Sequence, residues 1–382
     1  MKNVTILGST GSIGRQTLEI IADFPNLYKV DILTAHSNIA LLEEQCKIFK
    51  PNCIVITDAN ARNNFLKKTQ FKNDVFDGEI LKLSSIFFES DIVVSALVGI
   101  AGLLPTINAI KSGKTILFAN KEILVVAGNY IMNLARKNKV KIIPIDSEHS
   151  AIYQCLLGEK KENINKIILT ASGGPFLKLK NNELQNIKAA DALKHPTWNM
   201  GTKVTIDSAT MMNKGFEAIE AKWLFGLDIN KIDVVIHPQS IIHSMVEFVD
   251  GSVKAQLSPP DMRFPISFAL AEGNRIANNF EKLDFNKLNK LEFSPVPKNK
   301  FPCLDLVFSC AEKGGNACAI LNAANEIAVS EFIKNKINFL DIPRIIETAL
   351  ANIDFLENPS LDDLLATDAK TREYIQKLLA IN

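Results

Sequence analysis

The chain has 382 residues, 47% of them hydrophobic, and its 43 basic and 42 acidic side chains give a formal net charge of +1. This balance leaves no electrostatic footprint for nucleic acid or an anionic membrane, so we expect neither as a partner, and any anionic ligand must be bound by local groups. The length is too great for one ordinary core and predicts two or three domains.

The first part of the chain alternates short β-branched runs with helical patterns. Strands are predicted at residues 4–8, 30–35, 53–57, 91–97, 115–119 and 140–145, and helices at 14–24 and 122–138. This alternation is typical of an α/β fold with a doubly wound, Rossmann-like parallel sheet. The uncharged stretch 92–110 could span a membrane, but glycine, proline and polar residues interrupt it, so we expect a strand, a turn and a helix.

The later parts change character. Residues 164–176 predict a strand that runs into a glycine turn, 193–203 a mobile loop, and 208–226 a helix. Residues 241–259 predict two strands around an Asp250–Gly251 turn. The polar, proline-bearing stretch 276–300 suits a linker, and several helices are expected from residue 304 onward.

Cysteine usage and the start of the chain bear on its compartment. None of the six cysteines forms a C-x-x-C pair, and the first predicted strand leaves no room for a targeting peptide. We therefore expect reduced thiols in a cytoplasmic protein.

A glycine-rich turn near the amino terminus predicts a nucleotide site. Gly8, Gly11 and Gly14 lie between a predicted strand and a helix, where free N–H groups can bind a pyrophosphate. The alternative is a turn with a purely structural role. After the second strand, where an acid would select NAD, the chain has His36, Ser37 and Asn38, so we expect NADP(H).

Two carboxylates, Asp146 and Glu148, follow the last predicted parallel strand. On an extended chain residues i and i+2 share a face, so these like charges would repel, and a metal between them would relieve this. Mg²⁺ and Mn²⁺ prefer such oxygen ligands. Glu217 is the predicted third ligand, on a polar stripe beside an apolar one (Met212, Phe216, Ile219, Trp223). The alternative is a surface ion pair between Lys214 and Glu217.

Hydroxyl, amide and lysine groups predict a phosphate site. Ser172 lies in the glycine turn and Ser208 is expected to start the helix that carries Asn213 and Lys214. The alternatives are an ordinary glycine turn for Ser172 and a helix cap for Ser208. Further polar groups lie at a strand-to-helix junction (Asn120, Lys121, Glu122) and in the loop (His195, Trp198), and we favour a structural role for His237 and His243.

Taken together, these segments resemble the 1-deoxy-D-xylulose 5-phosphate reductoisomerase family. The motifs are "GSTGSIG", "ANKE", "IDSEHSA", "SGGPF", "HPTWNMGTKVTIDSATMMNKGFEAIEA", "HPQSIIHSMV", "GSVKAQLSPPDMR" and "LNAANEIAV", in order along almost the whole chain. The resemblance implies a homodimeric enzyme of isoprenoid precursor synthesis that uses NADPH and Mg²⁺ or Mn²⁺, with Co²⁺ as a third candidate. It would rearrange and reduce 1-deoxy-D-xylulose 5-phosphate to 2-C-methyl-D-erythritol 4-phosphate.

The resemblance also implies domains and site residues. We expect an NADPH-binding domain at 1–146, a catalytic and dimerisation domain at 147–275 with a lid loop near 194–202, a linker at 276–300 and a helical domain at 301–382. NADPH would contact Thr10, Gly11, Ser12, Ile13, Asn38, Asn120, Glu122 and Gly201. The metal would be held by Asp146, Glu148 and Glu217. The sugar phosphate would contact Lys121, Ser147, Glu148, Ser172, His195, Ser208, Asn213, Lys214 and Glu217.

One departure and two rival functions remain open at this point. The family usually has glycine, and often a basic residue, where this chain has His36 and Ser37.

A metal-independent NADP-dependent semialdehyde dehydrogenase would use the same nucleotide fold. A non-catalytic NADPH sensor would keep the glycine turn without needing the three carboxylates.

Overall fold

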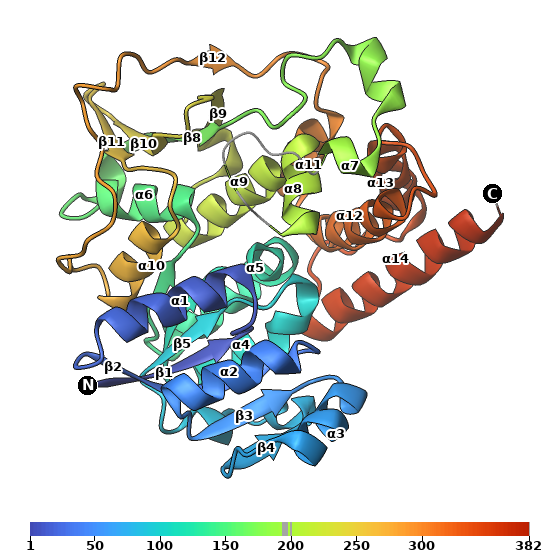
Figure 1. Cartoon of the computed structure of the whole chain (residues 1–382). Coiled ribbons are helices and arrows are strands. Elements are labelled where there is room, and N and C mark those ends of the chain that lie inside the picture. Colours follow the sequence, from blue (N-terminus) through green and yellow to red (C-terminus); the bar gives the residue numbers. More distant parts are fainter. Residues whose placement is uncertain (193–197, 199–200, 382) are drawn as a thin grey trace. The chain divides into compact units, whose positions relative to one another are not determined.

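The computed structural model describes residues 1–192, 198 and 201–381. These residues form two compact units, each assembled from three stretches of chain (Figure 1). Unit 1 comprises residues 1–123, 131–150 and 261–280, and unit 2 comprises residues 124–130, 151–260 and 281–382.

Unit 1 contains a seven-stranded sheet in which all paired strands are parallel. Its order is β4-β3-β2-β1-β5-β6-β7. The strands are β1 (Lys2–Leu7), β2 (Tyr28–Ala35), β3 (Cys53–Ile56), β4 (Asp74–Phe76), β5 (Ile92–Ser95), β6 (Thr115–Phe118) and β7 (Ile142–Pro144). The chain reverses direction across the sheet after β4, so the ends of β1 and β5 mark the switch point where such sheets bind ligands.

The helices associated with this sheet follow its strands in the chain, except α10, which belongs to the later stretch 261–280. They are α1 (Ser12–Asp23), α2 (Ile39–Phe49), α3 (Ala59–Lys68), α4 (Leu103–Lys111), α5 (Lys121–Lys137), α6 (Ser147–Cys155) and α10 (Arg263–Leu270). Buried residues of α1, α2 and α10 form one core with β1 and β2, which places these three helices on the same face. α5 has a kink at Ala127, and α5 and α6 each pass from one unit to the other.

Unit 2 contains a mixed five-stranded sheet of order β11-β10-β8-β9-β12. The strands are β8 (Ile164–Ala171), β9 (Ile232–Ile236), β10 (Ile242–Phe248), β11 (Val253–Leu257) and β12 (Ser294–Pro295). β8 and β9 pair in parallel, and the other pairs are antiparallel. Ile167, Leu169 and Val246 lie on the face that packs against the helices.

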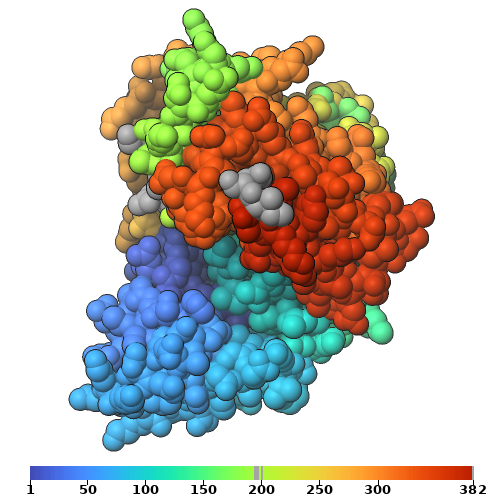
Figure 2. Space-filling view, turned by 90° about the vertical axis from the view of Figure 1, so that its right-hand side faces the viewer, coloured from blue at the N-terminus to red at the C-terminus, as the bar shows by residue number. Residues whose placement is uncertain are grey.

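The helices of unit 2 share one large core with this sheet. They are α7 (Ala189–Ala192), α8 (Thr202–Ala209), α9 (Met212–Phe225), α11 (Pro302–Lys313), α12 (Ala317–Ile333), α13 (Asp341–Asn352) and α14 (Leu361–Ile381). A Cβ on Gly215 would lie 2.7 Å from the side chain of Val307, so glycine lets α9 approach α11 closely. Figure 2 shows the carboxyl-terminal helices, coloured red, as one continuous surface.

The predicted α/β class, parallel sheet and helical tail are confirmed. The Asp250–Gly251 turn joins β10 to β11 as expected, with Gly251 at a φ of +83°. The stretch 92–110 forms a buried strand, a turn and a helix. Within the described ranges, no helix has both the length and the apolar composition that crossing a bilayer requires. β4 was not predicted, and the stretch 208–226 forms two helices instead of one.

Candidate functional site

The predicted nucleotide turn joins β1 to α1 in unit 1. Gly8 has a φ of +91°, and a Cβ there would lie 2.8 Å from the Ala96 carbonyl oxygen. A Cβ on Gly14 would lie 2.3 Å from the Gly8 carbonyl oxygen, so the turn folds this tightly only with glycine at both positions. The Ser9 hydroxyl donates to the Gln45 amide oxygen (2.8 Å), which fixes the turn to α2. No acidic residue lies in the first turn of α1, which suits an anion.

The chain after β2 has the hydrogen-bonding groups expected for a ribose 2′-phosphate. His36 is exposed, and its Nδ1 lies 2.8 Å from the Thr57 hydroxyl, which orients the ring. The neighbouring Ser37 is also exposed. Asn38 caps α2, accepting the Leu41 N–H through its side chain (3.3 Å).

The ends of β6 and β7 bring two predicted site residues together. Lys121, the first residue of α5, and Asp146, just after β7, form an ion pair with 2.8 Å between Nζ and Oδ2. Asn120 is buried, caps α5 and donates to the Gly99 carbonyl (2.9 Å). Glu122 is also buried at this junction. The sheet edge predicted to carry the chemistry is therefore rich in polar groups within unit 1.

The expectation of an extended chain at Asp146 and Glu148 is wrong. The Asp146 carbonyl accepts the Ser150 N–H (2.8 Å), so residues 147 and 148 lie in the first turn of α6. The carboxylates of Asp146 and Glu148 are nevertheless close together, with oxygen atoms within 4.8 Å of each other. The Ser147 hydroxyl donates to Glu148 Oε2 (2.5 Å), and the positive helix end favours both acids.

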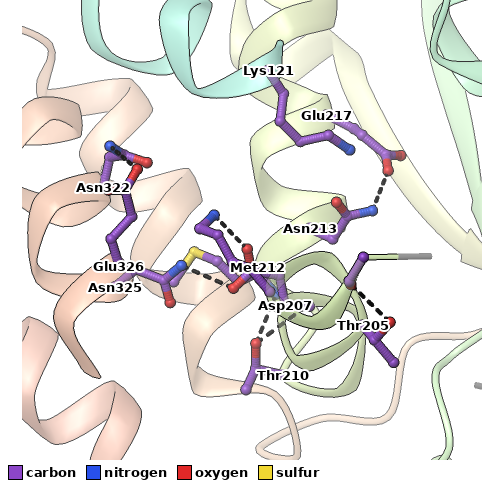
Figure 3. Close-up of polar contacts among 12 residues, drawn as sticks. Lys121, Thr205, Asp207, Thr210, Met212, Asn213, Glu217, Asn322, Asn325 and Glu326 are labelled. Atoms are coloured by element: carbon purple, nitrogen blue, oxygen red, sulfur yellow. Dashed lines mark hydrogen bonds and ion pairs between the residues drawn. The ribbon is translucent and has the colours of Figure 1, made fainter. Parts of the chain in front are cut away.

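α9 in unit 2 carries the predicted apolar and polar stripes. Met212, Phe216 and Ile219 are fully buried, and Trp223 packs against the same core. Glu217 is only 1% exposed, and its carboxylate accepts a hydrogen bond from the Asn213 amide (2.5 Å; Figure 3). It also accepts a hydrogen bond from the Lys214 ammonium. The Lys214–Glu217 ion pair therefore exists. The alternative required this pair to lie on the surface, but both side chains are buried.

The two predicted phosphate-binding serines lie on neighbouring backbone segments of unit 2. Ser172 follows β8, and its hydroxyl accepts the Gly174 N–H (3.2 Å), so the glycine-turn reading describes its local structure. A Cβ on Gly174 would lie 2.7 Å from the Ser208 carbonyl oxygen, which puts the two backbones in close contact.

Ser208 does not start the helix that carries Asn213. It lies in the last turn of α8, and α9 begins at Met212 after Met211, which has a left-handed φ of 62°. Ser208 therefore caps neither helix. A residue with a Cβ rarely adopts this backbone conformation, so the break between α8 and α9 was not predictable from the residue types.

The other predicted residues lie in the segment before α8, or in or next to strands of unit 2. His195 and most of the predicted lid lie outside the described residues. Trp198 is half-buried, with its ring 6.0 Å from that of His243. The His237 ring is buried and bonded to backbone groups through both nitrogens, as a structural role requires. Gly201 is exposed as the cap residue of α8.

Asp207 and Asn325 were not singled out in the sequence. Asp207 is 2% exposed and immediately precedes Ser208, and the fully buried Asn325 of α12 donates to its carboxylate across 118 residues of sequence (2.9 Å). The motif "LNAANEIAV" contained Asn325, but no local spacing links it to residue 207.

Family models match most of the chain. The 1-deoxy-D-xylulose 5-phosphate reductoisomerase model matches residues 4–128, its carboxyl-terminal domain model matches 142–225, and the DXP reductoisomerase carboxyl-terminal domain model matches 257–374. Relatives named 1-deoxy-D-xylulose 5-phosphate reductoisomerase are 50% identical in Caldanaerobacter subterraneus subsp. tengcongensis, covering 99% of both chains, and in Chloroherpeton thalassium, covering 98% of this chain and 97% of the relative.

Solved structures agree with this similarity. A DOX-P reductoisomerase in complex with NADPH, fosmidomycin and magnesium is 41% identical, with a TM-score of 0.93 over 100% of this chain and 99% of that one. The Zymomonas mobilis enzyme in complex with NADPH is 39% identical, with a TM-score of 0.91 over 99% of both chains.

Proposed function

Because the chain belongs to the 1-deoxy-D-xylulose 5-phosphate reductoisomerase family, we infer that it converts 1-deoxy-D-xylulose 5-phosphate to 2-C-methyl-D-erythritol 4-phosphate with NADPH and a divalent metal. The reaction belongs to isoprenoid precursor synthesis. The observation that carries this function is similarity over the whole chain, at 50% identity and 99% coverage, and not over the nucleotide fold alone.

NADPH supplies the hydride, and unit 1 supplies its binding groups. The backbone of Thr10, Gly11, Ser12 and Ile13 lies at the amino terminus of α1, suited to the pyrophosphate. His36, Ser37 and Asn38 would contact the 2′-phosphate. Asn120, Glu122 and Gly201 complete the proposed coenzyme set. Support comes from the tight glycine turn and from the Thr57 contact that orients His36.

A bound Mg²⁺, Mn²⁺ or Co²⁺ ion supplies Lewis-acid chemistry at the substrate carbonyl. Asp146, Glu148 and Glu217 would hold it. These three carboxylates are the hard oxygen donors that such ions prefer. The close approach of the Asp146 and Glu148 carboxylate oxygens, within 4.8 Å of each other, supports the assignment.

The substrate phosphate would be bound by Ser172, Ser208, Asn213 and Lys214. Hydroxyl, amide and ammonium donors suit its oxygens, and the contact between the Gly174 and Ser208 backbones supports their grouping. Lys121, Ser147 and His195 would contact the rest of the sugar. Gripping the non-reacting phosphate orients the carbon atoms where bonds change.

One experiment separates this function from its rivals. NADPH oxidation is followed with 1-deoxy-D-xylulose 5-phosphate, before and after chelation of metal and after adding Mg²⁺ back. We expect activity that disappears on chelation and returns with Mg²⁺. Turnover that survives chelation would favour a semialdehyde dehydrogenase, and tight NADPH binding without turnover would favour a sensor.

The chain is proposed to act as a cytoplasmic homodimer. β11 is an open sheet edge with Val253, Lys254 and Ala255 exposed, whereas the opposite edge strand β12 contains Pro295, which cannot donate a ladder hydrogen bond. Light scattering of the purified protein tests the dimer. The free cysteines among the described residues support a reducing compartment.

A further inference from the structure

The turn between α8 and α9, formed by Thr210 and Met211, has proposed phosphate ligands on both sides; we call residues 207–212 the α8–α9 corner. Ser208 precedes its left-handed residue Met211, and Asn213 and Lys214 follow it. A small rotation of this corner would therefore move groups on both helices relative to each other. The interactions that hold this corner in place therefore bear on the affinity for the substrate phosphate.

The corner is fixed first by its own hydrogen bonds. The Thr210 hydroxyl donates to the Asp207 carbonyl (3.2 Å) and accepts the Met212 N–H (3.3 Å). Met211 is 2% exposed and has a φ of 62°, a conformation that costs free energy for a residue with a Cβ. Such a conformation persists only where the surrounding structure holds it in place.

Asp207 links this corner to the helical region of unit 2. Its carboxylate accepts a hydrogen bond from the Asn325 amide at Oδ1 (2.9 Å; Figure 3). Its Oδ2 accepts a hydrogen bond from the Lys203 ammonium (2.8 Å). Both bonds involve a charged group and are therefore strong and directional. Asn325 is fully buried on α12, so α8 is tied to a rigid helix far away in sequence.

The way in which Asn325 is bonded favours orientation over stability. A carboxylate can only accept, so the amide must turn its Nδ2 toward Asp207. Its Oδ1 is then buried without a hydrogen-bond partner among the described protein groups. A buried acceptor left in this way costs free energy and offsets what the other bond contributes. The net effect of the Asn325–Asp207 bond is therefore to fix the orientation of α8 relative to α12.

We propose that Asp207 and Asn325 are positioning residues that hold the α8–α9 corner so that Ser208, Asn213 and Lys214 converge on the substrate phosphate. The inference rests on the proposed function for the identity of the ligand. Neither Asp207 nor Asn325 touches the substrate in this role. Loosening the pair should weaken phosphate binding and, because the phosphate grip orients the reacting carbon atoms, slow the chemical step by a smaller factor.

The test uses a reciprocal exchange in the full-length enzyme. Asn325→Asp places two carboxylates against each other, whereas Asp207→Asn combined with Asn325→Asp restores an amide facing a carboxylate. We expect N325D to raise KM for the sugar phosphate and Kd for inorganic phosphate by roughly tenfold or more, the effect of weakening one hydrogen bond to a charged group. We expect kcat to fall by a smaller factor and the exchanged pair to recover most of the loss in affinity.

Asn322→Asp is the matched control. Asn322 is also fully buried on α12 and donates to a carboxylate, that of Glu326 (3.2 Å), but it does not bond to α8. N322D should lower the melting temperature about as much as N325D while leaving KM and phosphate affinity unchanged. Equal effects of N322D and N325D on phosphate affinity would overturn the proposal, as would a folded exchanged pair without recovery.

A second variant and a second measurement test the proposal if N325D does not fold or the enzyme does not turn over the sugar phosphate. If N325D does not fold, Asn325→Leu keeps the volume and removes the donor, and unchanged KM and phosphate affinity in N325L would refute the positioning role. If the unaltered enzyme binds inorganic phosphate but does not turn over the sugar phosphate, the proposed function fails. Titration calorimetry of the same variants with inorganic phosphate still decides whether the pair positions the corner.

Discussion

Replacing Glu217 by glutamine tests the proposed third metal ligand directly. The change keeps the size of the side chain and removes the charge that accepts from Asn213 and Lys214. Both members of the ion pair are buried, Lys214 at 5% and Glu217 at 1% exposure. Removing one partner from such a pair costs about 3–5 kcal/mol. We expect the unfolding free energy to fall by this amount, metal affinity and turnover to be lost, and NADPH affinity to be retained.

A second variant separates stability from chemistry. Lys214→Met together with Glu217→Gln removes both charges, and replacing a whole buried pair is often nearly neutral for stability. The double variant should regain most of the unfolding free energy in urea and remain inactive. Denaturant unfolding, calorimetric titration with Mn²⁺ and NADPH binding are measured on all variants, so loss of fold and loss of metal are distinguished.

Glu220→Gln is the sharpest comparison, because Glu220 is also buried, at 2% exposure, one turn further along α9. Metal binding and turnover that survive in E217Q would show that Glu217 is not a ligand. Loss of both in E220Q alone would move the third ligand to Glu220.

Three further outcomes are expected. Gly14→Ala forces a Cβ to within 2.3 Å of the Gly8 carbonyl oxygen and should weaken NADPH binding by roughly 100-fold, measured by coenzyme fluorescence. The enzyme should prefer NADPH to NADH, and His36→Ala should raise Kd for NADPH by roughly 10–100-fold while leaving NADH binding unchanged, since one bond to a charged group contributes about 1.5–3 kcal/mol. Burial raises the pKa of the Cys46 and Cys53 thiols to about 12 and of Cys155 to about 11. These pKa values of the folded state exceed those of the unfolded chain, so the thiols' contribution to the unfolding free energy is complete below about pH 9 and is lost as the pH rises toward 11–12. The unfolding free energy in urea should therefore be lower at about pH 10.5 than at about pH 8. A flat profile, a G14A variant with full affinity, or equal losses for both coenzymes would each contradict the reasoning.

Local patterns predicted much of the fold because they follow from local chemistry. The glycine turn, six of the seven strands of the parallel sheet and the two stripes of α9 each depend on residues within a few positions of one another. β4 was missed because its three residues, Asp74–Phe76, are too short and too exposed to give a periodic signal. The helix at Ser147 was missed because the apolar run before it suggested that the strand continued.

Contacts between distant residues account for the other gaps. Met211 has a left-handed φ although methionine rarely adopts it, so the break between α8 and α9 reflects packing around a buried side chain. The Asp207–Asn325 bond joins residues 118 positions apart. The candidate ligands on α9 could be found from spacing, but the groups that orient them could not.

The interleaving of the two units has a consequence for synthesis on the ribosome. All seven strands of the parallel sheet have been made by residue 144, yet Ile266, Leu270 and Phe280 belong to the same core as β1 and α1. A nascent chain that has emerged only to residue 150 therefore exposes apolar surface that these side chains later cover. By the time residue 280 emerges, β8, β9, β10 and β11 have also been made. The two units must mature together, and truncation after the last parallel strand should yield an aggregation-prone fragment and not a free nucleotide-binding domain.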